Sequence, residues 1–374
     1  MIEKLKLRNF RNFENYEICF EKNINLIIWE NWKWKTNILE AISLLSNNPL
    51  QEIWFENLIK SDKNNMFISG NFKNNLVWVS FEKENINYID NNPVRKNSWK
   101  KKFLVNSKSI LRKNLNKFSS KTIIFSPVTM NLFYLSPNLR RKFLDNIIEN
   151  SFDDYKIYYK KFENILKQRN KLLKAIKEKK EKIESLNFWD WELIKSIIII
   201  YKYRKNLINF IKKDIWNLEK YFLNKNVKIS FEYESKINLQ NPLLTKQNFS
   251  EIIKKELENY LKKNLDLEII LWRTTIWPHL DDFNIKVDNY KIIDFASRWE
   301  IKSVILGLKF IEINYLEKNT KEIPIILIDD FLSELDGNHQ KLLLSKLSWF
   351  QTIVTAISDN FSLEENTIKK IFLK

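Results

Sequence analysis

The chain has 374 residues, 63 Lys and Arg against 46 Asp and Glu, and a formal net charge of +17. This length allows two or three lobes around sizeable cores. The charge suggests a polyanionic partner, most often a nucleic acid, with a general lysine bias of the proteome as the alternative. A single cysteine, Cys19, excludes a disulfide framework and a four-cysteine zinc site.

No segment resembles a signal peptide, because the N-terminus enters an amphipathic strand pattern at once. The longest apolar run, 197–201, is far too short to span a bilayer. We therefore expect a cytoplasmic protein.

The N-terminal part of the chain shows mainly strand patterns, with one helix among them. In chain order the pattern predicts two strands and then a buried strand within 1–30, a helix at 36–45, strand structure within 66–90, and a short buried strand at 123–125. Pro127 stops the last of these. Residues 1–135 are therefore predicted to be the N-terminal part of an α/β domain.

A helical pattern follows from Pro137 to about Tyr260. Within it, apolar residues at helical spacing between 162 and 176 lie in a basic stretch, which is either a solvated arm or a direct DNA contact. Beyond it the pattern predicts a strand at 269–271, a helix at 297–313, and strands at 323–328 and 353–357. The α/β domain is thus predicted to be split by a helical insertion, with its parts at 1–135, 136–262 and 263–374.

The segment after the buried strand at 25–28 carries a phosphate-binding pattern with tryptophan in its glycine positions. The P-loop pattern is G-x-x-x-x-G-K-[ST], and the residues here are Trp29, Glu30, Asn31, Trp32, Lys33, Trp34, Lys35 and Thr36. The loop needs glycine because its backbone adopts positive φ and its N–H groups touch the phosphates. Tryptophan suits neither task. Either the nucleotide site is dead, or the residues written as tryptophan at these positions are not tryptophan in the natural protein.

Composition shows the same anomaly, with only 3 Gly but 13 Trp. At the usual share of ~7%, roughly 26 Gly would be expected. One base change links the glycine codon GGA to UGA, which different genetic codes read as stop, tryptophan or glycine. We hypothesise that the source organism reads UGA as glycine, and that the gene was translated with a table that reads it as tryptophan.

The apolar segment 324–328 ends in Asp329 and Asp330, which is a Walker B pattern. In P-loop ATPases the first acid and the P-loop hydroxyl help to hold Mg²⁺, and a second acid orients or deprotonates the attacking water. Thr36 and Asp329 are therefore the candidate metal ligands, and Lys35 and Asp330 the candidate catalytic residues. Residues 332–336 follow at once and have the form of the D-loop of ABC-type ATPases, which lies across a dimer interface.

Ser297 and Trp299 lie at the start of a predicted helix. With glycine at 299, this segment has the shape of the ABC signature. A serine hydroxyl at a helix N-terminus is a good γ-phosphate binder, and in ABC-type ATPases it serves the ATP of the partner subunit. Thr355 ends a predicted strand where ABC proteins place a switch residue that senses the γ-phosphate.

Together these motifs make the chain similar, nearly end to end, to the RecF family of bacterial recombination mediators. The segments that carry the resemblance are 7–13, 31–42 (the family's N-G-x-G-K-T-N-x-L-E-A-I), 125–127 (F-S-P), 140–145 (R-R-x-F-L-D), 168–170 (Q-R-N), 272–274 (G-x-T) and 277–282 (G-P-H-R-D-D). The resemblance extends the nucleotide-binding set to Asn37. It gives His279 a place in a family motif, where a structural role is at least as well supported as a chemical one.

The departures from the family pattern are concentrated on glycine. Positions 29, 32, 34, 272, 277 and 299 all carry Trp where the family has Gly. Random decay of a dead ATPase would introduce many residue types and would also erode Lys35, Asp329 and Ser297. Trp349 reads as a further case, whereas Trp189 reads as a true tryptophan because the family has one there. Leu280 and Arg298 replace the family's Arg and Gln.

The resemblance implies an α/β fold, an ABC-type ATPase head of the P-loop class like those of SMC and Rad50 proteins, with an inserted helical lobe. It implies ATP and Mg²⁺, a weak ATPase, and an ATP-dependent homodimer that clamps duplex DNA near single-strand gaps. RecR is the implied partner, with RecO and RecA acting indirectly. Two rivals remain: a DNA-binding scaffold that no longer binds ATP, and an ABC-head nuclease partner or OLD-like ATPase. The lack of an acidic cluster after Asp336 argues against the second.

Overall fold

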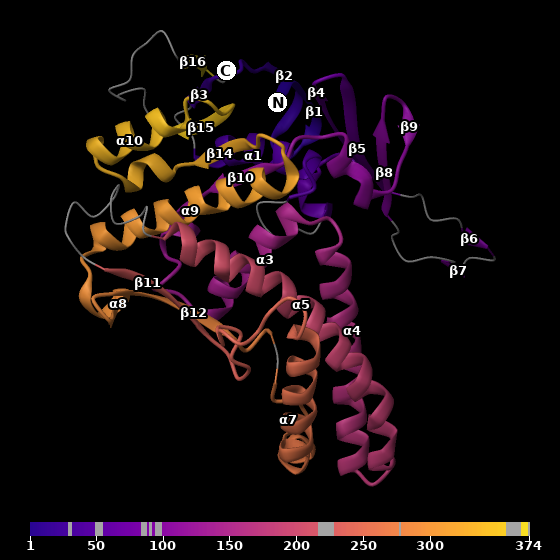
Figure 1. The fold of residues 1–374 in the computed structure, drawn as a ribbon. Helices are drawn as coiled ribbons and strands as arrows, with labels where there is room; N and C mark the ends of the chain where they lie inside the picture. Colours follow the sequence, from indigo (N-terminus) through magenta and orange to yellow (C-terminus); the bar gives the residue numbers. More distant parts are fainter. Residues whose placement is uncertain are drawn as a thin grey trace. The chain divides into compact units, whose positions relative to one another are not determined.

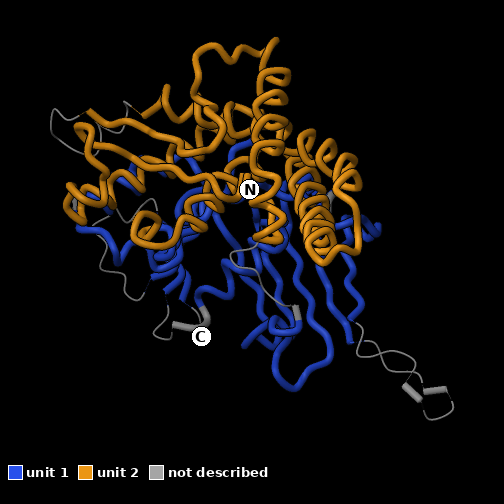
Figure 2. Tube along the Cα trace, turned by 90° about the horizontal axis from the view of Figure 1, so that it is seen from below, with its two compact units in different colours: residues 1–129, 321–374 blue, residues 130–320 orange. Residues whose placement is uncertain are grey.

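The computed structural model describes residues 1–28, 32–48, 55–83, 88–89, 92–93, 99–215, 228–276, 278–356 and 368–372 (Figure 1). The chain divides into two compact units (Figure 2). The first consists of residues 1–129 and 321–374, and the second of residues 130–320. Among the described residues, no helix is long and apolar enough to cross a membrane.

A parallel five-stranded sheet forms the centre of the first unit. Its strand order is β10 (Thr122–Phe125), β14 (Ile325–Asp329), β15 (Thr352–Ala356), β3 (Ile24–Ile28) and β16 (Ile368–Phe372). Strands β3, β14 and β15 are buried almost along their whole length, as expected where both faces of a parallel sheet are covered. Their carboxyl ends meet at one edge, which is where ligands bind in open α/β sheets.

An antiparallel sheet forms the second layer of this unit. Its order is β2 (Phe13–Cys19), β1 (Ile2–Phe10), β4 (Asn65–Phe72), β5 (Asn75–Lys83), β8 (Trp99–Val105) and β9 (Lys108–Ser109). Helix α1 (Trp32–Leu45) packs against both sheets, and its buried Ile38, Leu39 and Ile42 join the core that they share. Burial of each side chain of this size contributes about 1.5–3 kcal/mol to the free energy of folding. This core therefore fixes α1 against the two sheets.

The rest of the first unit consists of short elements. They are η1 (Phe55–Leu58), β6 (Tyr88–Ile89), β7 (Asn92–Pro93), η2 (Arg112–Lys117), α2 (Pro127–Met130), η4 (Phe331–Glu334) and α10 (Gly337–Leu347). Cys19 is an exposed residue at the end of β2.

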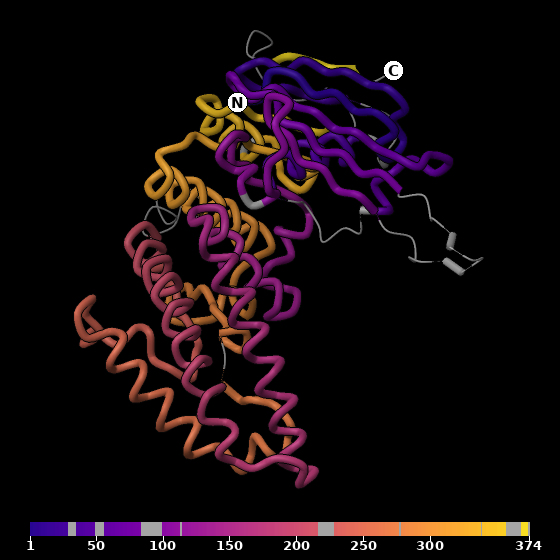
Figure 3. Tube along the Cα trace, turned by 90° about the vertical axis from the view of Figure 1, so that its right-hand side faces the viewer, coloured from indigo at the N-terminus to yellow at the C-terminus, as the bar shows by residue number. Residues whose placement is uncertain are grey.

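The second unit is mainly helical. Among its described residues the helices are α3 (Pro137–Ser151), α4 (Tyr155–Lys177), η3 (Ile183–Ser185), α5 (Leu186–Asp214), α7 (Phe249–Leu271), α8 (Ile292–Phe295) and α9 (Arg298–Thr320). A small antiparallel sheet has the order β11 (Ile229–Glu234), β12 (Asp282–Val287) and β13 (Tyr290–Lys291). Helices α4, α5 and α7 lie side by side and form an elongated arm (Figures 1 and 3).

Most predicted elements are confirmed, including the three N-terminal strands, the helices at 36–45 and 297–313, and the strands at 123–125, 323–328 and 353–357. The strand at 269–271 is wrong, because these residues form the last turn of α7. A run of three apolar residues cannot distinguish a strand from a helix end. Strand β11 lies in the region predicted to be helical and was missed. Residues 263–320 pack within the second unit; the motif-based division at 135 and 262 stays a prediction.

Candidate nucleotide site

The P-loop joins β3 to α1, the arrangement that the sequence predicts. Residues 29–31 lie outside the described part of the chain, as do the side chains of Trp32, Lys33 and Trp34. The predicted phosphate contacts of this loop therefore stay a prediction. Lys35 and Thr36 are described, and they lie in the first turns of α1. Asn37 follows them on the same helix, half-buried.

Lys35 is a fully buried cation. Its Nζ lies 3.8 Å from Asp330 Oδ1, and within the described part of the chain it has no hydrogen-bond partner. Burial lowers the pKa of Lys35, and the neighbouring Asp330 and Asp329 oppose that shift. A buried ammonium without hydrogen bonds is costly. The Lys35 ammonium therefore lacks the anionic oxygen partners that the phosphates of a nucleotide would supply.

The hydroxyl of Thr36 contacts the first Walker B acid. Thr36 Oγ1 donates to Asp329 Oδ1 at 3.0 Å and to Oδ2 at 3.2 Å. Burial raises the pKa of Asp329, while its hydrogen bonds from Thr36 and Thr355 act in the opposite direction. A hydroxyl beside a partly buried carboxylate is a set of hard oxygen donors suited to Mg²⁺. The structure thus brings the two predicted metal ligands together.

Asp330 has an unusual backbone conformation. Its φ is 46° and its ψ is 13°, in the left-handed region that is uncommon for non-glycine residues but that Asp adopts more readily than most. Its N–H donates to Thr355 Oγ1 at 3.1 Å. Burial raises the pKa of the Asp330 carboxyl, and the charge of Lys35 opposes the rise. A carboxylate with a raised pKa beside the candidate phosphate-binding lysine suits a group that accepts a proton from water.

The D-loop segment lies directly beyond Asp330. Ser333 Oγ donates to the carbonyl of Asp330 at 2.5 Å, and Asp336 caps α10 by accepting from the N–H of His339 at 2.9 Å. His339 lies on this helix, with its ring nitrogen 3.0 Å from Asp336. These bonds hold the turn after Walker B in one conformation.

Ser297 and Trp299 belong to the second unit, whereas Lys35, Thr36, Asp329 and Asp330 belong to the first. Ser297 immediately precedes α9 and forms a capping box with Glu300: the N–H and Oγ of Ser297 donate to Glu300 Oε2 at 2.7 and 2.8 Å. The serine hydroxyl therefore lies at a helix N-terminus, where an anion binds well. That Ser297 and Trp299 bind the ATP held by a second copy stays a prediction.

Trp272 ends α7 in a conformation typical of glycine. Its φ is 57°, its N–H bonds to the carbonyls of Glu268 and Ile269, and the N–H of Arg273 bonds to the carbonyl of Glu268. This is the Schellman pattern, in which the left-handed residue is usually Gly. Among the described non-glycine residues with positive φ, Trp272 is the only aromatic one.

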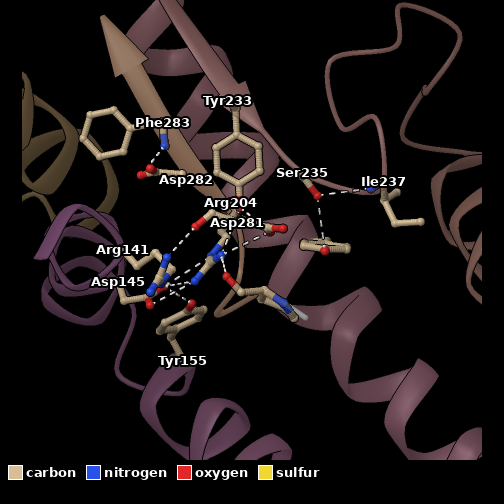
Figure 4. A network of polar contacts seen from close by, with 12 residues as sticks. Arg141, Asp145, Tyr155, Arg204, Tyr233, Ser235, Ile237, Asp281, Asp282 and Phe283 are labelled. Atoms are coloured by element: carbon tan, nitrogen blue, oxygen red, sulfur yellow. Dashed lines mark hydrogen bonds and ion pairs between the residues drawn. The ribbon is translucent and has the colours of Figure 1, made fainter. Parts of the chain in front are cut away.

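Two family motifs meet in a buried network that the sequence analysis did not anticipate (Figure 4). Arg204 of α5 donates to both oxygens of Asp145 at 2.9 and 3.0 Å, and it also contacts Asp281 and the carbonyl of Pro278. Tyr233 donates to Asp281 at 2.7 Å, and Tyr155 donates to Asp145 at 2.7 Å. The network ties segment 140–145 to segment 277–282. The only sequence signal for Arg204 is a lone arginine after an apolar helical run.

Neighbouring contacts extend this network. Arg140 makes two 2.8 Å hydrogen bonds to Asp282, and Arg141 donates to the carbonyl of Asp281 at 3.0 Å. Burial, with the charges of Arg141 and Arg204, lowers the pKa of His279 to about 4. His279 is therefore neutral near pH 7, which fits the structural role weighed for it. Farther along the arm, Arg169 and Asn170 bond to Thr274, so the Q-R-N and G-x-T motifs also meet.

A lysine in the first turns of the helix that follows β3, two Walker B acids at the end of β14 in the same parallel sheet, and a D-loop turn define an ABC-type ATPase head. No protein-family model matches the chain. The DNA replication and repair protein RecF of Thermoanaerobacter pseudethanolicus is 31% identical over 365 residues, which cover 95% of this chain and 93% of the relative. The chain belongs to the RecF family.

Solved structures agree with this assignment. A structure of the recombination mediator protein RecF with ATPrS, described in the RecFOR pathway, has a TM-score of 0.83 at 27% identity and covers 99% of this chain and 96% of its own. One of RecF with ATP has a TM-score of 0.79 at 28% identity, with 99% and 95% covered. The fold is that of RecF, an α/β ABC-type ATPase.

Proposed function

We propose that this chain is an ATP-dependent DNA-binding protein of recombinational repair, replication-fork maintenance and the SOS response, acting in the cytoplasm. One observation supports nucleotide binding above all. Lys35 is fully buried beside Asp330, and its Nζ has no hydrogen-bond partner among the described residues. The names of the relatives and the ATP of the solved RecF structure support the same function. The net charge of +17 supports a nucleic-acid partner.

Each residue at the site has a defined task. Lys35 neutralises charge on the β- and γ-phosphates of ATP, the substrate. Thr36 and Asp329 would hold Mg²⁺, which would neutralise phosphate charge when bound. Asp330 orients the attacking water and accepts its proton. Residues 29–37 surround the phosphates, and Ser297 with position 299 of a second copy completes the site. ATP therefore joins two copies around DNA, and slow hydrolysis releases them.

The partners proposed are those of the RecFOR pathway that the relatives' structures name. RecR binds the DNA-bound dimer, and RecO and RecA act indirectly at gaps. In this proposal the motif-bearing parts 1–135 and 263–374 form the ATPase head, with 136–262 as the inserted lobe.

We further propose that positions 29, 32, 34, 272, 277 and 299 are glycine in the source organism. The glycine-like helix end at Trp272 supports this independently of the P-loop. Mass spectrometry of the peptide that contains residues 29–34, from the source organism, tests the proposal. A mass that fits three glycines is expected, and one that fits three tryptophans contradicts recoding.

The alternative function is a DNA-binding scaffold with a dead nucleotide site. The printed sequence favours it, because three indoles at 29, 32 and 34 would fill the phosphate cradle. The two functions differ in their response to ATP, whereas both predict DNA binding that weakens steeply with salt.

Light scattering of the full chain with glycine at 29, 32 and 34 decides between them. Dimerisation is expected with ATP and Mg²⁺ but not with ADP, and Lys35→Ala, the matched control, is expected to remain monomeric. Equal dimerisation of both proteins, or of neither, would contradict the ATP-switch mechanism.

A further inference from the structure

Thr355 lies at the junction of the two nucleotide-binding strands. In the parallel sheet β15 lies between β14 and β3, so that Thr355 is the register partner of Asp329 on one side and of Ile27 on the other. Its side chain is fully buried. Thr355 is therefore fixed by two strands, one carrying Walker B and the other entering the P-loop.

The Thr355 hydroxyl contacts both Walker B acids at once. It accepts the backbone N–H of Asp330 at 3.1 Å, and it lies 3.1 Å from Asp329 Oδ1 and 3.3 Å from the carbonyl of Ile328. A hydroxyl has one proton to donate and two lone pairs to accept with. Donation to the Asp329 carboxylate is the stronger of its two options, because that acceptor is charged.

The contacts of the Thr355 hydroxyl with Asp330 and Asp329 each fix one feature of the Walker B acids. Asp330 has a φ of 46°, which is uncommon for a non-glycine residue, and the Thr355 hydroxyl accepts its N–H in that conformation. Asp329 has two hydroxyl partners in this part of the chain, Thr36 and Thr355. Thr36 is itself a candidate metal ligand, so Thr355 is the partner that remains to orient Asp329 when Thr36 turns to a metal.

We propose that Thr355 is a positioning residue, whose single hydroxyl orients the Asp329 carboxylate for Mg²⁺ and holds the Asp330 backbone so that its carboxylate faces Lys35. This inference rests on the proposed ATPase function. It differs from the γ-phosphate sensor expected from the sequence, because it requires no contact between Thr355 and the nucleotide. It acts through the two acids, and so it affects Mg²⁺ binding with ADP as well as with ATP.

The test compares Thr355→Val, which keeps the shape and removes the hydroxyl, with Thr355→Ser, which keeps the hydroxyl. Both are made in the full chain with glycine at 29, 32 and 34. Binding of fluorescent ADP and ATP analogues is titrated with Mg²⁺, and ATP hydrolysis is measured in a single turnover. If Thr355→Val does not fold, Thr355→Ser and Thr355→Ala form a second pair that differs only in the hydroxyl.

Loss of the hydroxyl is expected to raise the Mg²⁺ concentration for half-saturation about 10–100-fold with both nucleotides, since partners of metal ligands have effects of this size. The rate of single-turnover hydrolysis falls by a similar factor, whereas nucleotide binding without Mg²⁺ is unchanged. For Thr355→Ser, the Mg²⁺ concentration for half-saturation and the hydrolysis rate both stay within about threefold of the parent values. An unchanged Mg²⁺ requirement, or a change with ATP alone, overturns the positioning role while the proposed function stands. A parent chain that binds neither nucleotide overturns both.

Discussion

Lys35 and Arg204 are both fully buried cations, but their surroundings differ sharply. Arg204 has charged hydrogen bonds to Asp145 and contacts Asp281 and a backbone carbonyl (Figure 4). Lys35 has one carboxylate at 3.8 Å and, among the described residues, no hydrogen-bond partner. Burial alone would lower the pKa of both, yet Asp145 and its neighbours raise the pKa of Arg204 well above its usual value while that of Lys35 stays lowered.

This difference separates a structural charge from a functional one. A satisfied network stabilises one packing arrangement, and removing one member leaves the others buried and unpaired. An unsatisfied charge contributes little to stability and is retained because a ligand completes it. Three predictions test the two buried cations and their surroundings, and a fourth tests the helix end at Trp272, from the largest expected effect to the smallest.

The largest effect is expected from Arg204→Met. Removing the guanidinium leaves Asp145 and Asp281 buried without their cation, so the free energy of unfolding of the second unit should fall by about 3–5 kcal/mol. Urea denaturation followed by circular dichroism measures it. Lys202→Met, an exposed position on the same helix, is the control and should change stability by less than about 0.5 kcal/mol. A similar effect of both variants would show that the network is not structural.

The corresponding substitution at the nucleotide site, Lys35→Met, should behave in the opposite way. Without nucleotide we expect a change of less than about 1 kcal/mol, because the lost ion pair is weak and the relieved burial cost is of similar size. In the glycine form, ATP with Mg²⁺ at 100 times Kd should stabilise the parent by about 2.7 kcal/mol and the variant not at all. Thermal unfolding with and without nucleotide measures this. A strongly destabilised Lys35→Met would make Lys35 a structural cation like Arg204.

His279 beside the Arg204 network should make the second unit sensitive to acid. Its pKa is about 4 in the fold and ~6.5 unfolded, so the unfolded state binds more protons between these values and stability falls as the pH drops through 6.5 towards 4. Between pH 7 and pH 5 the loss should be about 1–2 kcal/mol, allowing for solvent screening.

Denaturation at the two pH values, repeated with His279→Gln, isolates this contribution. The variant shares all other titrating groups with the parent, and so only the difference between the two pH dependences is assigned to His279. Identical pH dependences would show that His279 is protonated as readily in the fold as outside it.

The smallest effect is expected from Trp272→Gly. Relief of the left-handed conformation should outweigh the exposed contact of the indole with Lys177 and raise stability by about 0.5 kcal/mol. Trp189→Gly, within α5, should lower it by at least ~1 kcal/mol, because glycine disfavours a helix interior. Urea denaturation of the two variants compares them. Equal destabilisation would remove the structural support for glycine at 272.

Sequence reasoning identified Lys35, Thr36, Asp329 and Asp330 because each belongs to a local pattern of fixed spacing. It also placed the strands that carry them, since buried parallel strands are continuous apolar runs. It did not anticipate the Arg204 network. Asp145 and Asp281 lie in family motifs, but Arg204, Tyr155 and Tyr233 belong to no motif, and these residues meet only through the packing of α3, α4, α5 and β11. The role of Thr355 depends on the register of β15 against β14, which pairing in the sheet sets and no single segment displays.

The helix end at 272 shows a different kind of limit. Three apolar residues before Trp272 read equally well as strand or helix, and a glycine at 272 would have marked the end of a helix. Because the sequence has tryptophan at 272, it lacks this signal for a helix end, and the strand predicted at 269–271 is wrong.

Calorimetric titration of Mg²⁺ and ATP into the full chain with glycine at 29, 32 and 34 tests the central claim most directly. We predict saturable binding at one site per chain, abolished by Lys35→Ala. Absence of saturable binding to the glycine form, or equal binding by Lys35→Ala, would contradict a nucleotide site built on Lys35.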